Sequence, residues 1–132
     1  MSTHYHAVVW IDHQQARVIH FNLAEVEERT LHAPHTPHHL QAKAGSPSGT
    51  HLRGEDLYYR EVAEALASAR EVLITGPSSA KRELVEYLKK HKPELLAHVD
   101  AVETVDKISD AELVAAARRH FRAADRMKPQ LG

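Results

Sequence analysis

The sequence contains no cysteine, and this absence excludes several kinds of chemistry at once. Disulfide bonds, thiolate metal sites and a cysteine nucleophile are all ruled out. No apolar run approaches the roughly 20 residues that span a bilayer. No Lys or Arg precedes an apolar segment at the N-terminus, so a signal peptide is not indicated. We therefore expect a cytoplasmic protein with no membrane partner.

The chain also lacks an excess of either charge, because 17 basic residues are balanced by 18 acidic ones, giving a net charge of −1. The molecule as a whole therefore has no strong attraction for nucleic acid. Histidine is the residue type in excess, with twelve in 132 residues, and its side chain titrates close to neutral pH. The length predicts one domain over residues 1–132, large enough to fold without a required cofactor.

The apolar pattern predicts three strands followed by alternating helices and strands. The expected strands are residues 6–12, 16–22, 25–32, 71–75 and 98–105, and the expected helices are residues 54–69, 80–91 with an extension from Pro93, and Ser109 to about Arg126. Ser109 and Glu112 form a capping box at the start of the last helix. The order βββ, loop, αβαβα predicts an α/β fold, a ribonuclease H-like mixed five-stranded sheet that is a β-meander followed by αβαβα, with helices on its faces.

The periodicity also predicts which helical residues face the core. In the first helix the predicted inward residues are Leu57, Tyr58, Val62, Ala65, Leu66 and Ala69. In the last helix they are Leu113, Val114, Ala117 and Phe121.

Residues 33–53 form a long histidine-rich loop, because they contain three prolines and two glycines and no regular pattern. A loop of this length in a compact domain is usually functional or disordered. No acidic residue lies between Thr30 and Gly54, whereas the histidines and cations of the loop are His35, His38, His39, Lys43, His51 and Arg53. One interpretation is an RNA-facing loop that approaches phosphates through imidazole and cationic donors. A second is a Zn²⁺ site at His35, His38 and His39, and a third is a polar loop without a ligand.

Several segments, in order along nearly the whole chain, resemble a known family. Val8-Val9-Trp10-Ile11-Asp12 with Ala16-Arg17-Val18 is similar to the opening hairpin of the middle domain of archaeo-eukaryotic class-1 peptide release factors. The segments 59–64 (Tyr-Arg-Glu-Val-Ala-Glu) and 72–77 (Val-Leu-Ile-Thr-Gly-Pro) are similar to the helix after that family's functional loop and to its next strand. The chain most resembles the bacterial relatives of this domain, the translational machinery proteins.

The loop departs from the family pattern at the position that matters for catalysis. In the classical factors it ends in Gly-Gly-Gln, which promotes ester hydrolysis in the peptidyl-transferase centre, and no Gly-Gly-Gln occurs here. The family's first and third domains have no counterpart in this sequence either. The resemblance therefore implies a ribosome-related role, such as rescue or hibernation, without classical peptidyl-tRNA hydrolysis.

Two further cationic segments are candidates for contact with RNA or the ribosome. The turn Gly76-Pro77-Ser78-Ser79 precedes a helix whose N-terminus could hold a phosphate with Lys81, or Ser78 or Ser79 could simply cap that helix. Arg118, Arg122 and Arg126 form a stripe on the last helix. They are either RNA contacts or a solvated face favoured by the helix dipole.

Asp12 ends the first strand at the position where ribonuclease H enzymes place a metal-binding carboxylate. Asp100, Glu103 and Asp106 lie on or after the last strand, and nuclease chemistry would require these groups to converge on metal ions. The alternative for Asp12 is a turn residue.

Three hypotheses remain open at this point. The leading one is a non-catalytic or weakly catalytic release-factor-like domain that binds the ribosome or ribosomal RNA. The second is a metal-dependent hydrolase or nuclease that uses the histidine-rich loop or Asp12. The third is a structural module whose strand edge pairs with a second copy.

Overall fold

The computed structural model describes residues 6–34 and 54–127. The elements in chain order are β1 (His6–Ile11), β2 (Gln15–Phe21), β3 (Val26–His32), α2 (Gly54–Leu66), β4 (Glu71–Gly76), α3 (Ala80–His91), α4 (Pro93–Leu96), β5 (Val99–Thr104) and α5 (Asp110–Met127). Every strand and helix predicted from the sequence is present, with ends that differ by at most three residues. In this part of the chain, no helix combines the length and hydrophobicity that a membrane span requires.

The five strands form one mixed sheet in the order β3-β2-β1-β4-β5. β1 pairs antiparallel with β2, and β2 with β3, whereas β4 lies parallel to both β1 and β5. The parallel pairs arise because a helical crossover returns the chain to the same end of the sheet before each new strand. The predicted mixed five-stranded α/β fold is confirmed.

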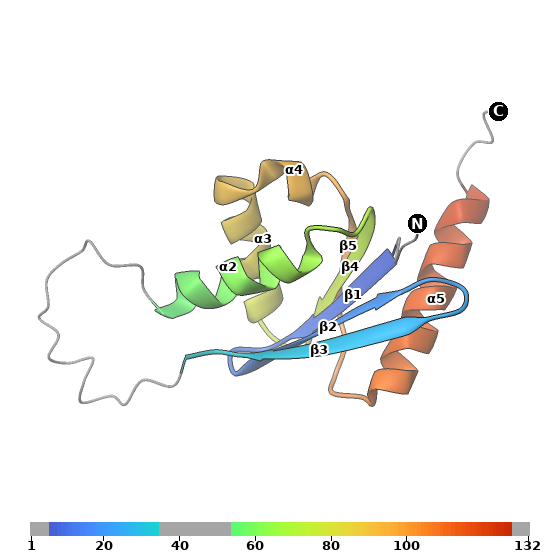
Figure 1. The fold of residues 1–132 in the computed structure, drawn as a ribbon, viewed down its shortest axis with the longest axis horizontal. Coiled ribbons are helices and arrows are strands. Elements are labelled where there is room, and N and C mark those ends of the chain that lie inside the picture. The colour runs from blue at the N-terminus through green and yellow to red at the C-terminus, as the bar shows by residue number, and fades with distance from the viewer. Residues whose placement is uncertain (1–5, 35–53, 128–132) are drawn as a thin grey trace, which may run out of the picture.

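Helices cover both faces of the sheet, with α2, α3 and α4 on one face and α5 on the other (Figure 1). β1 is buried on both faces because its side chains alternate between them. Val9 and Ile11 belong to the core beneath α2 and α3, whereas Val8 and Trp10 pack toward α5. The four residues of α5 that the periodicity predicts to face inward are all buried.

The predicted inward face of α2 is partly wrong. Leu57 is 39% exposed, whereas Tyr59 is 4% exposed and belongs to the core. At 100° per residue, Leu57 shares its side of the helix with Glu61 and Glu64, so that side faces the solvent. The buried face instead includes both tyrosines, whose hydroxyls reach toward the carboxyl end of β1.

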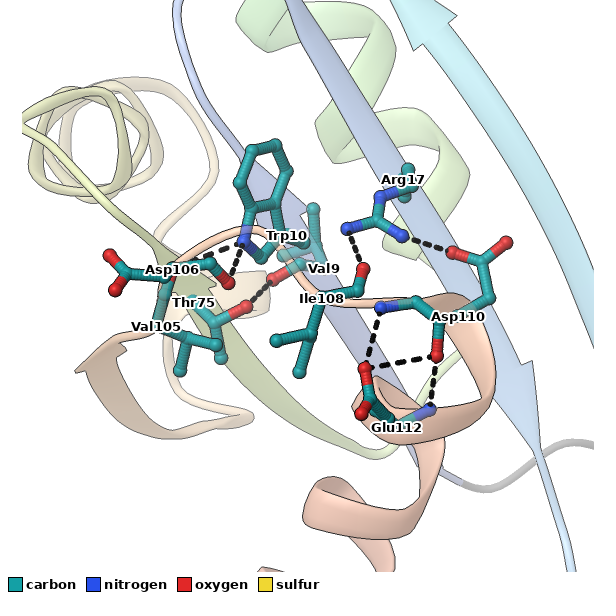
Figure 2. Close-up of polar contacts among 10 residues, drawn as sticks. Val9, Trp10, Arg17, Thr75, Val105, Asp106, Ile108, Asp110 and Glu112 are labelled. Carbon is teal, nitrogen blue, oxygen red and sulfur yellow. Dashed lines mark hydrogen bonds and ion pairs between the residues drawn. The ribbon is translucent and has the colours of Figure 1, made fainter.

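Side chains of β1 and β2 hold the β5–α5 connection against the face of the sheet that α5 covers (Figure 2). The indole N–H of Trp10 donates to the carbonyls of Val105 and Asp106, at 3.1 and 3.2 Å. Arg17 donates to the Ile108 carbonyl at 2.8 Å and to the Asp110 carboxylate, and its guanidinium lies 4.9 Å from the centre of the Trp10 ring. These contacts set the position of α5 on the sheet.

The capping box predicted at the start of α5 is confirmed. The Ser109 N–H donates to Glu112 Oε1 at 3.0 Å, and the Glu112 N–H donates to Ser109 Oγ at 3.1 Å. Two otherwise unpaired backbone donors are thereby satisfied reciprocally.

Candidate functional site

The anchors of the histidine-rich loop lie at one end of the sheet. β3 ends at His32 and α2 begins at Gly54, and both points lie on the side of Figure 1 away from α5. The Ala33 N–H donates to the Gln14 carbonyl at 2.9 Å, which ties the exit of β3 to the β1–β2 turn. The predicted ligands His35, His38, His39, Lys43, His51 and Arg53 lie outside the described residues, so their assignments to RNA or Zn²⁺ stay predictions.

Asp12 closes the β1–β2 turn beside these anchors. Its Oδ1 accepts the backbone N–H groups of Gln14 and Gln15, each at 2.8 Å, and its carbonyl accepts the Tyr58 hydroxyl at 2.9 Å. This is the side-chain-to-backbone pattern that makes aspartate a turn residue. Burial, and secondarily the nearby Asp12 carboxylate, raise the pKa of Tyr58, which keeps its hydroxyl a donor.

Two of the carboxylates that the nuclease hypothesis requires, Asp100 and Glu103, face His120 of α5. Asp100 Oδ2 lies 2.6 Å from His120 Nε2, and Glu103 Oε2 lies 3.6 Å from His120 Nδ1, on the edge of the sheet that β5 forms. Among the described residues, no group of three or more His, Asp or Glu side chains could hold a metal ion. The observed role of Asp12 is therefore structural.

Glu83 of α3 joins three segments next to the loop anchors. Its Oε1 accepts the Tyr59 hydroxyl at 2.7 Å and lies 3.2 Å from His13 Nε2, and its Oε2 accepts the Ser79 hydroxyl at 3.3 Å. Burial acts to raise the pKa of Glu83, but the hydrogen bonds from Tyr59, His13 and Ser79 outweigh it, so the pKa is lowered. The ionised carboxylate thus links the β1–β2 turn, α2 and α3 into one hydrogen-bonded cluster around Glu83.

An acidic pocket of about 330 Å³ opens beside this Glu83 cluster, between α2 and α3. Its lining residues are Asp56, Tyr59, Glu83, Glu86, Tyr87, Lys90 and His91. Three carboxylates against one ammonium group and one imidazole give the pocket a negative balance. A phosphate backbone is repelled by such a surface, so this pocket is not suited to RNA.

Lys81 does not offer a charge to a ligand at the Gly76–Ser79 turn. It lies on the inward side of α3 and is 4% exposed, and its Nζ donates to the Ser78 carbonyl at 2.8 Å. Its ammonium group is thus occupied in stabilising the turn itself. Ser79 occupies the N-cap position without a side-chain cap hydrogen bond. The prediction that Lys81 contacts phosphate is therefore not supported by its position.

Arg118 and Arg122 lie at the other end of the sheet from the loop anchors. Arg118 Nη2 donates to the Asn22 carbonyl in the β2–β3 turn at 3.0 Å, and its guanidinium lies 5.6 Å from the Phe21 ring centre. Arg122 is exposed. This turn and the end of β3 lie at opposite ends of β2, whose seven residues span about 20 Å. The described surfaces therefore hold two separate candidate regions rather than one footprint.

The arginine region borders a pocket of about 340 Å³ that the sequence reasoning did not anticipate. Its lining residues are His6, Phe21, Asn22, Leu23, Arg118, Phe121 and Arg122. Leu23 is 99% exposed, at the tip of the turn. Two sequence signals point to this place, the arginine stripe of the last helix and the leucine in the turn Asn22-Leu23-Ala24-Glu25.

Other proteins share this fold. No protein-family model and no curated protein matches the chain. Among solved structures it is similar to Archaeoglobus fulgidus Pelota, with 19% identity and a TM-score of 0.59 over 86% of this chain and 30% of Pelota. It is similar to the archaeal translation termination factor aRF1, with 19% identity and a TM-score of 0.55 over 92% of this chain and 38% of aRF1.

A third similar structure is Saccharomyces cerevisiae Dom34, a translation termination-like factor, with 8% identity and a TM-score of 0.51 over 76% of this chain and 29% of Dom34. The chain thus spans between 29% and 38% of the length of these three proteins. At these identities the likeness shows the fold alone, a mixed five-stranded α/β sheet with helices on its faces. It agrees with the resemblance found in the sequence motifs.

Proposed function

We propose that this chain is a translation-factor-like domain that associates with the ribosome or with ribosomal RNA. The observation that carries the proposal is the fold, which solved structures of Pelota and aRF1 share over 86% and 92% of this chain. The anchored loop between β3 and α2, with its acid-free and histidine-rich sequence, is the proposed contact. A rescue or hibernation role fits better than termination, because the chain contains no Gly-Gly-Gln.

The charges of the described surface support a contact through the loop rather than through the helices behind it. The pocket between α2 and α3 is negative, and Lys81 is buried. The proposed donors are therefore the loop residues His35, His38, His39, Lys43, His51 and Arg53. Arg118 and Arg122 lie in a separate region, so they are not part of this proposed contact.

Co-sedimentation of the full chain with 70S ribosomes over a salt series tests this proposal. Binding is expected to strengthen as salt falls, because each phosphate contact releases a counterion. The double variant Lys43→Glu with Arg53→Glu should weaken binding and reduce the salt dependence. A matched control, Arg82→Glu with Lys89→Glu, changes the net charge equally at two exposed residues of α3 and should bind as the wild type does.

Two results would contradict the proposal. The absence of co-sedimentation at low salt would remove ribosome association altogether. Equal weakening by the loop variant and the α3 control would show that only net charge matters and that the loop is not the contact. Replacing residues 35–53 with a short Gly-Ser linker provides a further check, because it should abolish binding and leave the circular dichroism spectrum of the sheet and helices unchanged.

A further inference from the structure

The pocket beside the β2–β3 turn has an apolar floor and a cationic rim. Phe21 and Phe121 form the floor, with 3% and 2% exposure. Leu23 stands at one side with its side chain almost wholly in solvent. Arg118 and Arg122, one helical turn apart on α5, supply two guanidinium groups, and none of the seven lining residues is acidic. A ligand that fits must therefore carry an apolar group and negative charge close together.

The parts of this pocket are held in place before any ligand arrives. Asn22 Oδ1 accepts the N–H groups of Ala24 and Glu25, at 2.8 and 2.7 Å, which fixes the turn that carries Leu23. Arg118 is held by its hydrogen bond to the Asn22 carbonyl and by its position over Phe21. A preorganised site binds more tightly because less conformational entropy is lost on binding.

We propose that this pocket binds an acidic peptide segment of a partner protein that bears a bulky apolar side chain between its carboxylates. The apolar side chain enters against Leu23, above the Phe21 and Phe121 rings. The carboxylates pair with Arg118 and Arg122, since guanidinium and carboxylate form bidentate, charge-assisted hydrogen bonds. Arginine next to buried apolar anchors is the usual composition of protein interface hot spots.

A peptide explains this surface better than RNA does. Proteins that bind single-stranded RNA stack its bases on exposed aromatic faces, whereas the small exposed parts of Phe21 and Phe121, 3% and 2%, can contact a side chain but offer no open ring face for a base. The His6 ring lies against Phe121, with 4.4 Å between centroids, and covers part of it. The exposed side chain at the tip, Leu23, is aliphatic and offers no stacking face. The volume of about 340 Å³ is at the small end of ligand sites and suits one or two side chains.

The site lies about 20 Å from the loop anchors, at the opposite end of β2. The proposal does not depend on ribosome association, because it rests on the pocket alone.

An NMR titration of the ¹⁵N-labelled full chain tests the proposal with defined probes. The probe is the acetylated, amidated peptide Gly-Asp-Glu-Phe-Glu-Asp-Gly. Two matched peptides replace its Phe by Gly, or its four acids by Lys, and oligouridylate serves as the RNA probe. We expect saturable amide shifts in residues 22–25 and 118–122 with the first peptide only.

Variants identify which side chains bind the probe. Arg122→Glu should weaken binding about tenfold, as expected for loss of a close charge pair and its replacement by repulsion. Arg119→Glu makes the same change of charge on an exposed neighbour that does not line the pocket, and should change binding less than about twofold. Leu23→Ser should weaken binding without unfolding the protein, because its side chain is exposed.

Four outcomes would overturn the proposal. The first is the absence of saturable shifts with the acidic Phe peptide. The second is equal binding of the Gly peptide, which would mean charge attraction without use of the pocket. The third is tighter binding of oligouridylate at the same amides, which would make this an RNA site. The fourth is a concentration-dependent shift of these amides without any peptide, which would show that a second copy of the chain occupies the pocket.

Discussion

Replacement of Arg17 by methionine is expected to loosen α5 from the sheet. The Arg17 side chain is 12% exposed and contacts the Ile108 carbonyl, the Asp110 carboxylate and the Trp10 ring. Methionine retains most of the apolar stem and removes the guanidinium. The Asp110 side chain is 35% exposed, so water can hydrate it after the substitution. The Ile108 carbonyl loses the donor that Arg17 supplies.

The magnitude follows from these contacts. A hydrogen bond to a charged partner contributes about 1.5–3 kcal/mol, and one to a carbonyl about 1 kcal/mol. The position over the Trp10 ring adds about 0.5–1 kcal/mol. Arg17 Nε is buried without a hydrogen-bond partner, so its removal offsets the loss of stability by about 1 kcal/mol. We therefore expect Arg17→Met to lower the free energy of unfolding by about 3 kcal/mol.

Urea unfolding measures this directly through the fluorescence of Trp10, the one tryptophan of the chain. The midpoint of thermal unfolding should fall by roughly 10 °C for a chain of this size. Arg29→Met is the matched control, since Arg29 is exposed on β3 and its loss should cost less than about 0.5 kcal/mol. Equal effects of the two substitutions would refute the reasoning, because they would show that the contacts of Arg17 carry no net stabilisation.

Two further predictions concern residues close to the loop anchors. A Cβ at Gly76 would lie 2.2 Å from the Ile11 carbonyl oxygen. We therefore expect Gly76→Ala to lower the free energy of unfolding, measured in urea, by about 3 kcal/mol or more. Wild-type stability of this variant would contradict the observed packing of β4 on β1. The pKa of Glu83 is below its ordinary value of 4.5, so its ionised form stabilises the fold above that pH, and the stabilisation is lost as pH falls through the lowered pKa. Wild type should therefore exceed Glu83→Gln in stability near neutral pH and lose this advantage as pH falls below 4.5, whereas a constant difference would show that Glu83 titrates alike in both states.

Local sequence patterns predicted the elements of this fold because their causes are local. A run such as Val8-Val9-Trp10-Ile11 is apolar and β-branched, and Ser109 with Glu112 satisfies the backbone donors at a helix start. The order of the elements then predicted the mixed sheet, because crossover connections restrict the topology. The chemistry that cysteine would bring was excluded by composition alone.

The roles of single polar residues were decided by partners that lie far away in the sequence. Arg17 matched a motif of the hairpin, yet its contacts come from Ile108 and Asp110, more than ninety residues later. Lys81 follows a turn that suits phosphate, but the rotation of α3 places it inward, where it bonds to Ser78. A residue type and its spacing carry no information about such long-range neighbours.

The separation of the two cationic regions also required the tertiary structure. In the sequence, the histidine-rich loop and the α5 arginines are both cationic segments and could belong to one surface. The antiparallel return of β2 and β3 places the loop anchors and the Leu23 turn at opposite ends of the sheet, and α5 packs on the face opposite to α2. The sequence by itself thus determined which elements form and which residue types the chain can use. Strand direction and sheet face, which depend on contacts between distant segments, decided which of those residues meet.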